Sequence, residues 1–321
     1  MKALLNKVFW FVLPFVVVFI ALELFITFKV STFGNKARYF KKNLEHVEVL
    51  VLGSSHNQNA INPKYFNRFT ANVAYGGQDV RLDSALFFNY AHKLKRLKAV
   101  ILELDYTTIN QKLEANYFRL PWYYHYYGVE LFKLPIEKKI SLYASSPTFF
   151  NTQLKTMLSG DSYPYIISAN GFCENDFPGV FLSNDYSDSL LKPLLIKKTK
   201  DEIKADKSNN LWGNFSTIKS IVNYCNKNDI AVICNVPPIY LKAVDYEKPL
   251  KRKILDSFTD YLKNQYNLTI LARPRENDFI SRDFKDFTHL NSDGAKKYSL
   301  LLADTINKIL KKENQTSDTN N

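Results

Sequence analysis

The sequence predicts a three-layer α/β/α domain built on a parallel sheet, preceded by one membrane-spanning helix. Short apolar runs rich in β-branched residues alternate with segments whose apolar residues recur at helical spacing, an order typical of βαβ units. The span is predicted by residues 8–28, which carry a single charge, Glu23. With 321 residues, of which 46% are hydrophobic, the chain is long enough to bury one large core.

The N-terminal apolar segment has the length of a bilayer span. About 20 apolar residues cross the hydrocarbon core, whereas a cleaved signal peptide has a shorter apolar core and a small-residue cleavage site. We therefore expect residues 1–29 to be an uncleaved anchor and residues 30–46 a basic juxtamembrane linker; the alternative is a buried helix of a soluble protein. A simple count of the basic residues on each side of the span would place the large domain in the cytoplasm, because more of them follow the span than precede it. Long domains, however, can cross membranes regardless of such charges.

Residues 47–312 are predicted to form the folded domain. Its first α/β stretch has strands at 47–53, 70–77 and 98–106 and a helix at 80–97. Its second has helices at 209–230 and 248–266, strands at 231–240 and 268–274, and a last helix that begins near Asn291 or Ser292. Residues 107–200 break the alternation and predict an aromatic-rich insertion or lid, whose rings either hold sugars or pack together. Residues 313–321 are predicted to be a disordered tail.

The net charge and the cysteine spacing limit the classes of partner and cofactor that we expect. The net charge of +12 favours anionic surfaces, but no zinc finger, helix-turn-helix or RNA-binding signature is present, so we expect no nucleic-acid partner. The three cysteines, Cys173, Cys225 and Cys234, form no CxxC pair, which argues against a metal or dithiol site. We expect no cofactor.

Three polar blocks lie where strands end or the last helix begins. They are Gly53-Ser54-Ser55-His56, the run from Asn72 to Gly77, and Asp286-Phe287-Thr288-His289. Parallel sheets place their active sites beyond the carboxyl ends of the strands, so we expect these blocks to meet. Attack by a serine on an acyl group needs a base, a carboxylate that orients the base, and donors aimed at the developing oxyanion.

The order of these blocks resembles the SGNH/GDSL hydrolase superfamily. The Gly-Ser-Ser variant, the anchor and the aromatic insertion are more similar to its membrane-linked branch, which includes the D-alanyl transfer protein of teichoic acid synthesis and the alginate O-acetylation proteins. The resemblance covers about 47–106 and 228–311 and implies a flavodoxin-like sheet. It also implies that Ser55 is the nucleophile, His289 the general base and Asp286 its orienting carboxylate. The backbone N–H groups of Ser55 and Gly77 would be oxyanion donors.

One block departs from the family pattern. The family has Gly-x-Asn-Asp at its third block, and the Asn side chain completes the oxyanion hole; here the third strand ends Glu103-Leu104-Asp105-Tyr106. A carboxylate at this place would repel an oxyanion. Candidates for a replacement donor, or for a substrate contact, are His56, Asn57 and Tyr106.

Each site residue also has a purely structural interpretation. Ser55 would then shape a turn, Asp286 would cap the last helix, His289 would be a hydrogen-bonded loop residue and Gly77 would belong to a plain tight turn. Ser54 is an alternative nucleophile. Glu103 and Asp105 with His289 offer three potential metal ligands, but no further ligand is evident, and we predict no metal site.

The resemblance implies serine-dependent acyl chemistry. We expect a membrane-anchored esterase or O-acyltransferase that transfers or removes an acyl group, acetyl above all, on a cell-envelope polysaccharide, with the catalytic domain facing outward and a membrane-bound acyltransferase as partner. One alternative is a catalytically degenerate glycan-binding protein or scaffold; another is a lipid esterase or thioesterase. A nucleotide-binding Rossmann protein fits poorly, because Gly-Ser-Ser-His lacks the glycines of GxGxxG.

Overall fold

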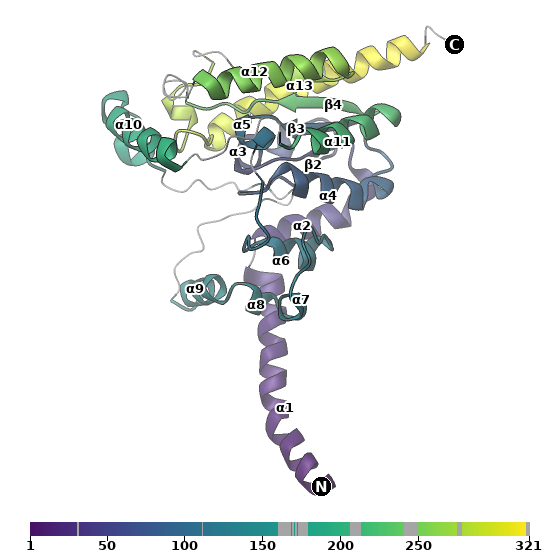
Figure 1. Ribbon diagram of the computed structural model, residues 1–321, viewed down its shortest axis with the longest axis vertical. Helices are drawn as coiled ribbons and strands as arrows, with labels where there is room; N and C mark the ends of the chain where they lie inside the picture. Colours follow the sequence, from purple (N-terminus) through teal and green to yellow (C-terminus); the bar gives the residue numbers. More distant parts are fainter. Residues whose placement is uncertain are drawn as a thin grey trace. The chain divides into compact units, whose positions relative to one another are not determined.

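The computed structural model describes residues 1–30, 32–110, 112–159, 168, 170, 172, 179–205, 213–240, 249–274 and 278–318. The chain divides into two compact units (Figure 1). Unit 1 contains Met1–Arg38 and Ala115–Tyr163; unit 2 contains Tyr39–Glu114 and Pro164–Asn321. The predicted insertion at 107–200 is therefore shared between the two units.

Unit 2 is built on the predicted parallel sheet. Its five strands are β1 (Val49–Val51), β2 (Thr70–Asn72), β3 (Ala99–Glu103), β4 (Ala231–Asn235) and β5 (Thr269–Leu271). They pair in parallel in the order β2-β1-β3-β4-β5, which is the doubly wound order of flavodoxin-like folds. The fold class predicted from the sequence is thus confirmed. β1 and β3 are buried along their whole length, as their unbroken apolar runs predict.

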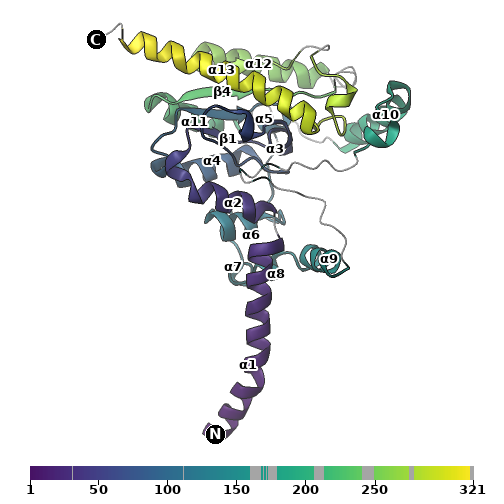
Figure 2. The same ribbon diagram turned by 180° about the vertical axis from the view of Figure 1, so that it is seen from behind.

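Helices cover both faces of this sheet. One face carries α4 (Val80–Tyr90), α11 (Phe215–Lys227) and α12 (Pro249–Gln265), which pack against one another through aromatic pairs such as Phe87 with Tyr224 and Phe215 with Phe258 (Figure 1). The other face carries α3 (Ser55–Ala60) and α13 (Ser292–Asp318), and α13 lies in front of α12 in Figure 2. Two further helices of this unit are α5 (Tyr106–Asn110) and α10 (Asp188–Ala205).

The last helix is fastened to the first βα connection. It begins at Ser292, at the predicted position. Inside it, the fully buried Ser299 accepts a hydrogen bond from the backbone N–H of Asn62 at 2.8 Å and donates to the carbonyl of Ala295 at 2.6 Å. The predicted tail at 313–321 begins within α13, and its last three residues lie outside the described part of the chain.

Unit 1 consists of the N-terminal helix and short helices from 115–163. α1 (Lys2–Phe25) continues as a π-helix (Ile26–Val30), and Lys2–Phe28 is the one described helix long and apolar enough to cross a membrane. The second segment forms α6 (Leu120–Trp122), a π-helix (Tyr123–Tyr127), α7 (Ile136–Ile140), α8 (Leu142–Ser145) and α9 (Pro147–Leu158). The predicted linker at 30–46 contains α2 (Thr32–Lys42).

Aromatic side chains form the core of unit 1. The ring of Phe33 is surrounded by those of Trp122, Tyr123, Tyr126 and Tyr127, with centroids 4.9–5.8 Å away. All of these side chains are buried. Of the two interpretations left open by the sequence, packing is therefore the one that describes this part of the aromatic-rich segment.

Candidate active site

The first and third polar blocks meet at the carboxyl end of the sheet. Ser55, the first residue of α3, places its Oγ 2.8 Å from Nε2 of His289, which precedes α13. The other imidazole nitrogen, Nδ1, lies 3.0 Å and 2.9 Å from the two carboxylate oxygens of Asp286. The three side chains thus form a continuous hydroxyl–imidazole–carboxylate chain, the arrangement that activates a serine in acyl-transfer enzymes.

The Asp286 loop holds the imidazole by local hydrogen bonds. Asp286 Oδ1 accepts the backbone N–H groups of Thr288 at 2.8 Å and His289 at 2.9 Å, a tight turn that a carboxylate at this spacing favours. Only three positions separate the carboxylate from the histidine, so the same turn fixes both ends of the Asp–His hydrogen bond. Asp286 caps its own loop; it does not cap α13.

The charges of this pair suit a general base. Burial lowers the pKa of His289 below its usual value; the hydrogen bond and the charge of Asp286 oppose the fall, and the positive charges of His56 and Lys285 add to it. Burial would raise the pKa of Asp286, but the hydrogen bond with His289 and the nearby positive charge outweigh it and hold that pKa well below its usual range. At pH 7 the carboxylate is ionised and the imidazole is free to accept a proton.

Glu103 holds the turn that carries the serine. Its carboxylate, fully buried at the end of β3, accepts the backbone N–H of Ser54 at 2.8 Å, that of Asn57 at 3.0 Å and the hydroxyl of Ser54 at 2.5 Å. Gly53 makes this approach feasible, since a Cβ there would lie 2.6 Å from Glu103 and its φ is +132°. The hydroxyl of Ser54 is committed to Glu103, which argues against Ser54 as the nucleophile.

His56, the histidine of the first block, is a cation at neutral pH. Its Nδ1 donates to Asp105 Oδ2 at 3.1 Å, and Glu103 Oε1 lies 3.6 Å away. Burial alone lowers the pKa of His56, but the hydrogen bond to Asp105 and the charges of Glu103, Asp105 and Asp286 outweigh it, and the pKa rises to about 9. The ring centroids of His56 and His289 are 5.3 Å apart. A positive charge therefore stands beside the serine at neutral pH.

Of the candidate oxyanion donors in the described part of the chain, two backbone N–H groups are available and one side-chain amide is already hydrogen-bonded. The backbone N–H groups of Ser55 and Gly77 have no hydrogen-bond partner among the described residues, and Gly77 has a φ of +76° in the turn after β2. Asn57 was a wrong choice: its side chain is fully buried, and its amide N–H groups bond the carbonyl of Leu52 at 2.7 Å and Asn235 Oδ1 at 3.1 Å. The side chain of Tyr106 lies outside the described residues.

Sequence reasoning missed a buried network behind the serine. Asn57 and Asn235 exchange amide hydrogen bonds, and Asn235 also donates to the hydroxyl of Tyr298 at 3.3 Å. Asp83 Oδ1 accepts the backbone N–H of Gly53 at 2.9 Å and Gln78 Nε2 at 2.5 Å. The polar ends of β4 and α4 are the signals that could have indicated these residues, since a buried polar group needs a partner.

The acidic groups near the serine also raise the question of a metal. His56, Glu103 and Asp105 place one ligand atom each within 4.8 Å of one another, so the histidine of this set is His56 and not His289, which was considered from the sequence. Each carboxylate already accepts hydrogen bonds: Glu103 from the Ser54–Asn57 turn, and Asp105 from His56 and from Thr108 N–H and Oγ1. This donor set fits hydrogen bonding, and we assign no metal to it.

Comparison with known proteins gives a weak structural similarity. No protein-family model matches the sequence, and no curated protein is similar to it. The chain is similar to the crystal structure of a protein from Bacteroides fragilis NCTC 9343 described as a candidate acylhydrolase. The two chains are 13% identical, the match covers 86% of this chain and 98% of the other, and the TM-score is 0.40. A similarity of this strength carries no argument about activity, so the function has to be inferred from the site.

Asp83, whose carboxyl group bonds the backbone of Gly53, makes the stability of the protein depend on pH. Burial raises the pKa of Asp83 to about 8, against the hydrogen bonds of Gln78 and Gly53, so the unfolded chain loses this proton long before the folded protein does. Stability is therefore lost as the pH rises from about 4 to 8, at about 1.4 kcal/mol per pH unit for this one proton.

We expect Asp83→Asn, which stays neutral, to remove that slope. The wild-type protein and the variant are unfolded in detergent at pH 5 to 8.5, and the difference in their free energies of unfolding should move in favour of the variant as the pH rises. If the free energies of unfolding of the two proteins change in parallel with pH, Asp83 is ionised in the folded state and the prediction is wrong.

Proposed function

We propose that this protein is a membrane-anchored serine esterase or O-acyltransferase whose nucleophile is Ser55. The observation that carries the proposal is the hydrogen-bonded chain from Ser55 through His289 to Asp286, with 2.8 Å between Ser55 Oγ and His289 Nε2. A lowered pKa on the histidine and an ionised aspartate support the roles of general base and orienting carboxylate.

The proposed reaction has two halves. His289 takes the hydroxyl proton as Ser55 Oγ attacks the acyl carbonyl, and Asp286 stabilises the imidazolium that forms. The tetrahedral oxyanion collapses, His289 gives the proton to the leaving alkoxide, and an acyl-serine remains. In the second half His289 takes a proton from water or from a sugar hydroxyl, whose oxygen attacks the acyl-serine. The second tetrahedral intermediate collapses, and His289 returns the proton to Ser55 Oγ as it leaves. Water completes hydrolysis, and a sugar hydroxyl completes transfer.

The oxyanion is stabilised by the backbone N–H groups of Ser55 and Gly77 and by the charge of His56. His56 compensates for the absent asparagine of the third block, because its imidazolium supplies positive charge where Glu103 and Asp105 alone would repel an oxyanion. Glu103 accepts hydrogen bonds from the backbone amides of Ser54 and Asn57, and Asp105 is paired with His56. This pairing weakens the main argument for a catalytically degenerate protein.

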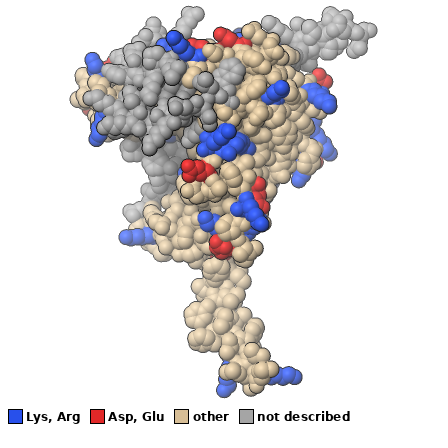
Figure 3. Space-filling model, in the orientation of Figure 1, with Lys and Arg blue, Asp and Glu red and all other residues tan. Residues whose placement is uncertain are grey.

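The substrate and the location rest on the resemblance to membrane-linked SGNH proteins. We propose an acetyl ester of a cell-envelope polysaccharide as the substrate, an outward-facing domain held by α1, and a membrane-bound acyltransferase as the partner. The apolar length of α1, in which Glu23 is the only charge between Val8 and Phe25 and the basic groups seen in Figure 3 lie at the N-terminal end, supports the anchor. The alternative function, a lipid esterase, requires activity on long acyl chains. Comparing the rates of hydrolysis of an acetyl and a palmitoyl ester in one assay distinguishes the two functions.

A fluorophosphonate probe tests the nucleophile. We expect the full-length protein in detergent to be labelled, with the label mapped to Ser55 and not to Ser54 by mass spectrometry. Ser55→Ala and His289→Ala should abolish labelling, and Asp286→Asn should slow it by about 10³- to 10⁴-fold, since the imidazole would then lose its orienting carboxylate. Labelling that survives Ser55→Ala, or a folded wild type that takes no label, would contradict the proposal.

The pH profile of labelling tests the two histidines separately. The rate should rise with pH through the lowered pKa of His289, below 6.5, as the base loses its proton, and fall near pH 9 as His56 loses its charge. His56→Gln should lower the plateau on the order of 10²-fold and remove the falling limb. Circular dichroism at each pH is the control, because the raised pKa of His56 also means that stability is lost as the pH rises from about 6.5 to about 9. An unchanged falling limb in His56→Gln would exclude His56 as the oxyanion partner.

The orientation of the domain is tested with reporters fused after Asn321. An alkaline phosphatase fusion, which needs export, should be active in cells, and a green fluorescent protein fusion should be dark when exported through the general secretion route. The reverse pattern would place the catalytic domain in the cytoplasm and remove the envelope polysaccharide as its substrate.

A further inference from the structure

The single acidic residue of the N-terminal span has a defined role in unit 1. Glu23 accepts the backbone N–H groups of Leu142 at 3.0 Å and Tyr143 at 3.1 Å, and also the hydroxyl of Ser141. These three donors are the first turn of α8, so the carboxylate of α1 caps a helix from a distant part of the sequence. The only charge in the apolar segment therefore fastens residues 141–143 to α1.

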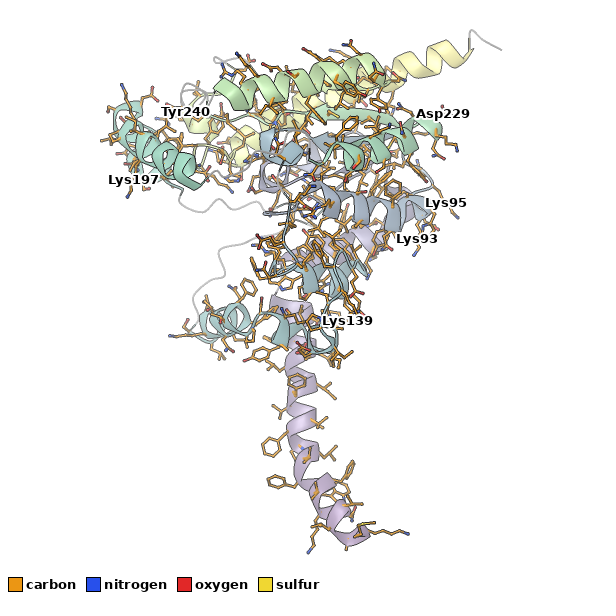
Figure 4. All side chains as sticks on the ribbon, viewed as in Figure 1. Lys93, Lys95, Lys139, Lys197, Asp229 and Tyr240 are labelled. Atoms are coloured by element: carbon orange, nitrogen blue, oxygen red, sulfur yellow. The ribbon has the colours of Figure 1, made fainter. Side chains whose placement is uncertain are left out.

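This contact fixes the level of α7 and α8 along the span. The apolar helix runs to Phe28, and Glu23 lies five residues before that end. At about 1.5 Å per residue, the capped turn lies roughly 7 Å inside the apolar segment. Figure 1 shows α7 and α8 beside the upper part of α1, and Figure 4 shows Lys139 of α7 at the same place. If α1 crosses a bilayer, α7 and α8 meet its surface.

α7 exposes two isoleucines beside the acidic side chain of Glu137. Ile136 and Ile140 are 67% and 72% exposed, and residues four apart lie on the same side of a helix. Nothing in the described part of the chain covers them. Basic side chains accompany them: Lys133 is exposed, and Lys139 is paired with Glu130 at 2.6 Å. Apolar side chains beside lysines at the end of a span match the boundary between acyl chains and headgroups.

Two polar side chains complete the boundary at the end of the span. Arg38 donates to the carbonyls of Thr27 at 2.8 Å and Phe28 at 3.1 Å, and the hydroxyl of Tyr126 donates to Thr27 at 3.3 Å. These carbonyls belong to the π-helix that ends the apolar segment. Arginine and tyrosine at the end of a membrane helix are typical of the interfacial belt.

We propose that residues 136–145 form an interfacial element that inserts Ile136 and Ile140 into the leaflet from which α1 emerges, and that Glu23 holds this element at the required depth. The occupant that covers these two isoleucines is the lipid bilayer, argued from their continuity with the span and from the lysines beside them. The inference rests on the proposed anchoring by α1 and is independent of the chemistry at Ser55. It makes unit 1 a membrane-embedded base rather than a soluble accessory.

Nitroxide labels on the full-length protein in nanodiscs of three parts phosphatidylcholine to one part phosphatidylglycerol test the depth. Cys173 is first replaced by Ser. This background variant should take up no label, because its two remaining cysteines, Cys225 and Cys234, are buried. Single cysteines then replace Ile140, Val17 in the shaft of α1, or the exposed Asp304 of α13. Collisions with oxygen and with a water-soluble nickel chelate report the depth of each label.

We expect the Ile140 label to be shielded from the nickel chelate several-fold more than the Asp304 label, and less than the Val17 label. Glu23→Ala should return the Ile140 label to water and leave Val17 shielded, whereas the matched loss of an exposed carboxylate, Glu45→Ala, should change neither. An Ile140 label as accessible as Asp304, with Val17 shielded, overturns the interfacial element and leaves the anchor intact. A Val17 label open to the chelate overturns the anchor and the inference with it.

Discussion

The candidate site depends on the hydrogen bonds that the Glu103 carboxylate accepts from the turn after β1. A βα turn that presents a serine exposes several backbone N–H groups at the start of its helix, and these need acceptors once they are buried. Glu103 reaches across from β3, the neighbouring strand, and satisfies those of Ser54 and Asn57. The same contact takes up the hydroxyl of Ser54, so that Ser55 alone faces the imidazole. The register between β1 and β3, which is set by apolar packing, therefore determines the position of the Ser55 hydroxyl.

Electrostatic balance explains how so many acidic groups coexist near a site proposed to stabilise an anion. Glu103 is surrounded by donors, Asp105 is paired with a charged His56, Asp286 bonds His289, and Asp83 keeps its proton. The two imidazoles are then driven apart in pKa by their surroundings, one upward and one downward. A difference of this kind between neighbouring titratable groups is how proteins separate the roles of acid and base.

The sequence predicted the features that depend on local pattern and missed those that depend on topology. Parallel strands follow from apolar runs, and the turn holding Asp286 beside His289 follows from their spacing. Strand lengths were overestimated: 70–77 is a strand only to Asn72, because the turn at Tyr75 to Gln78 ends the ladder. Asn57 with Asn235, 178 positions apart, could not be paired from the sequence, since only the strand order brings them together. For the same reason Glu103 was expected to repel an oxyanion, although it binds backbone amides.

Ser299 hydrogen-bonds α13 to the first βα connection, and this contact can form only after α13 has been synthesised. The serine belongs to the first tenth of the folded sequence after the anchor, whereas its imidazole follows 234 positions later and is secured by the last helix. A nascent chain that has not reached His289 displays the Ser55 hydroxyl without the His289 imidazole beside it. The hydrogen bond between Ser55 and His289 forms only when the C-terminal end docks, so a product truncated before His289 would lack the proposed base.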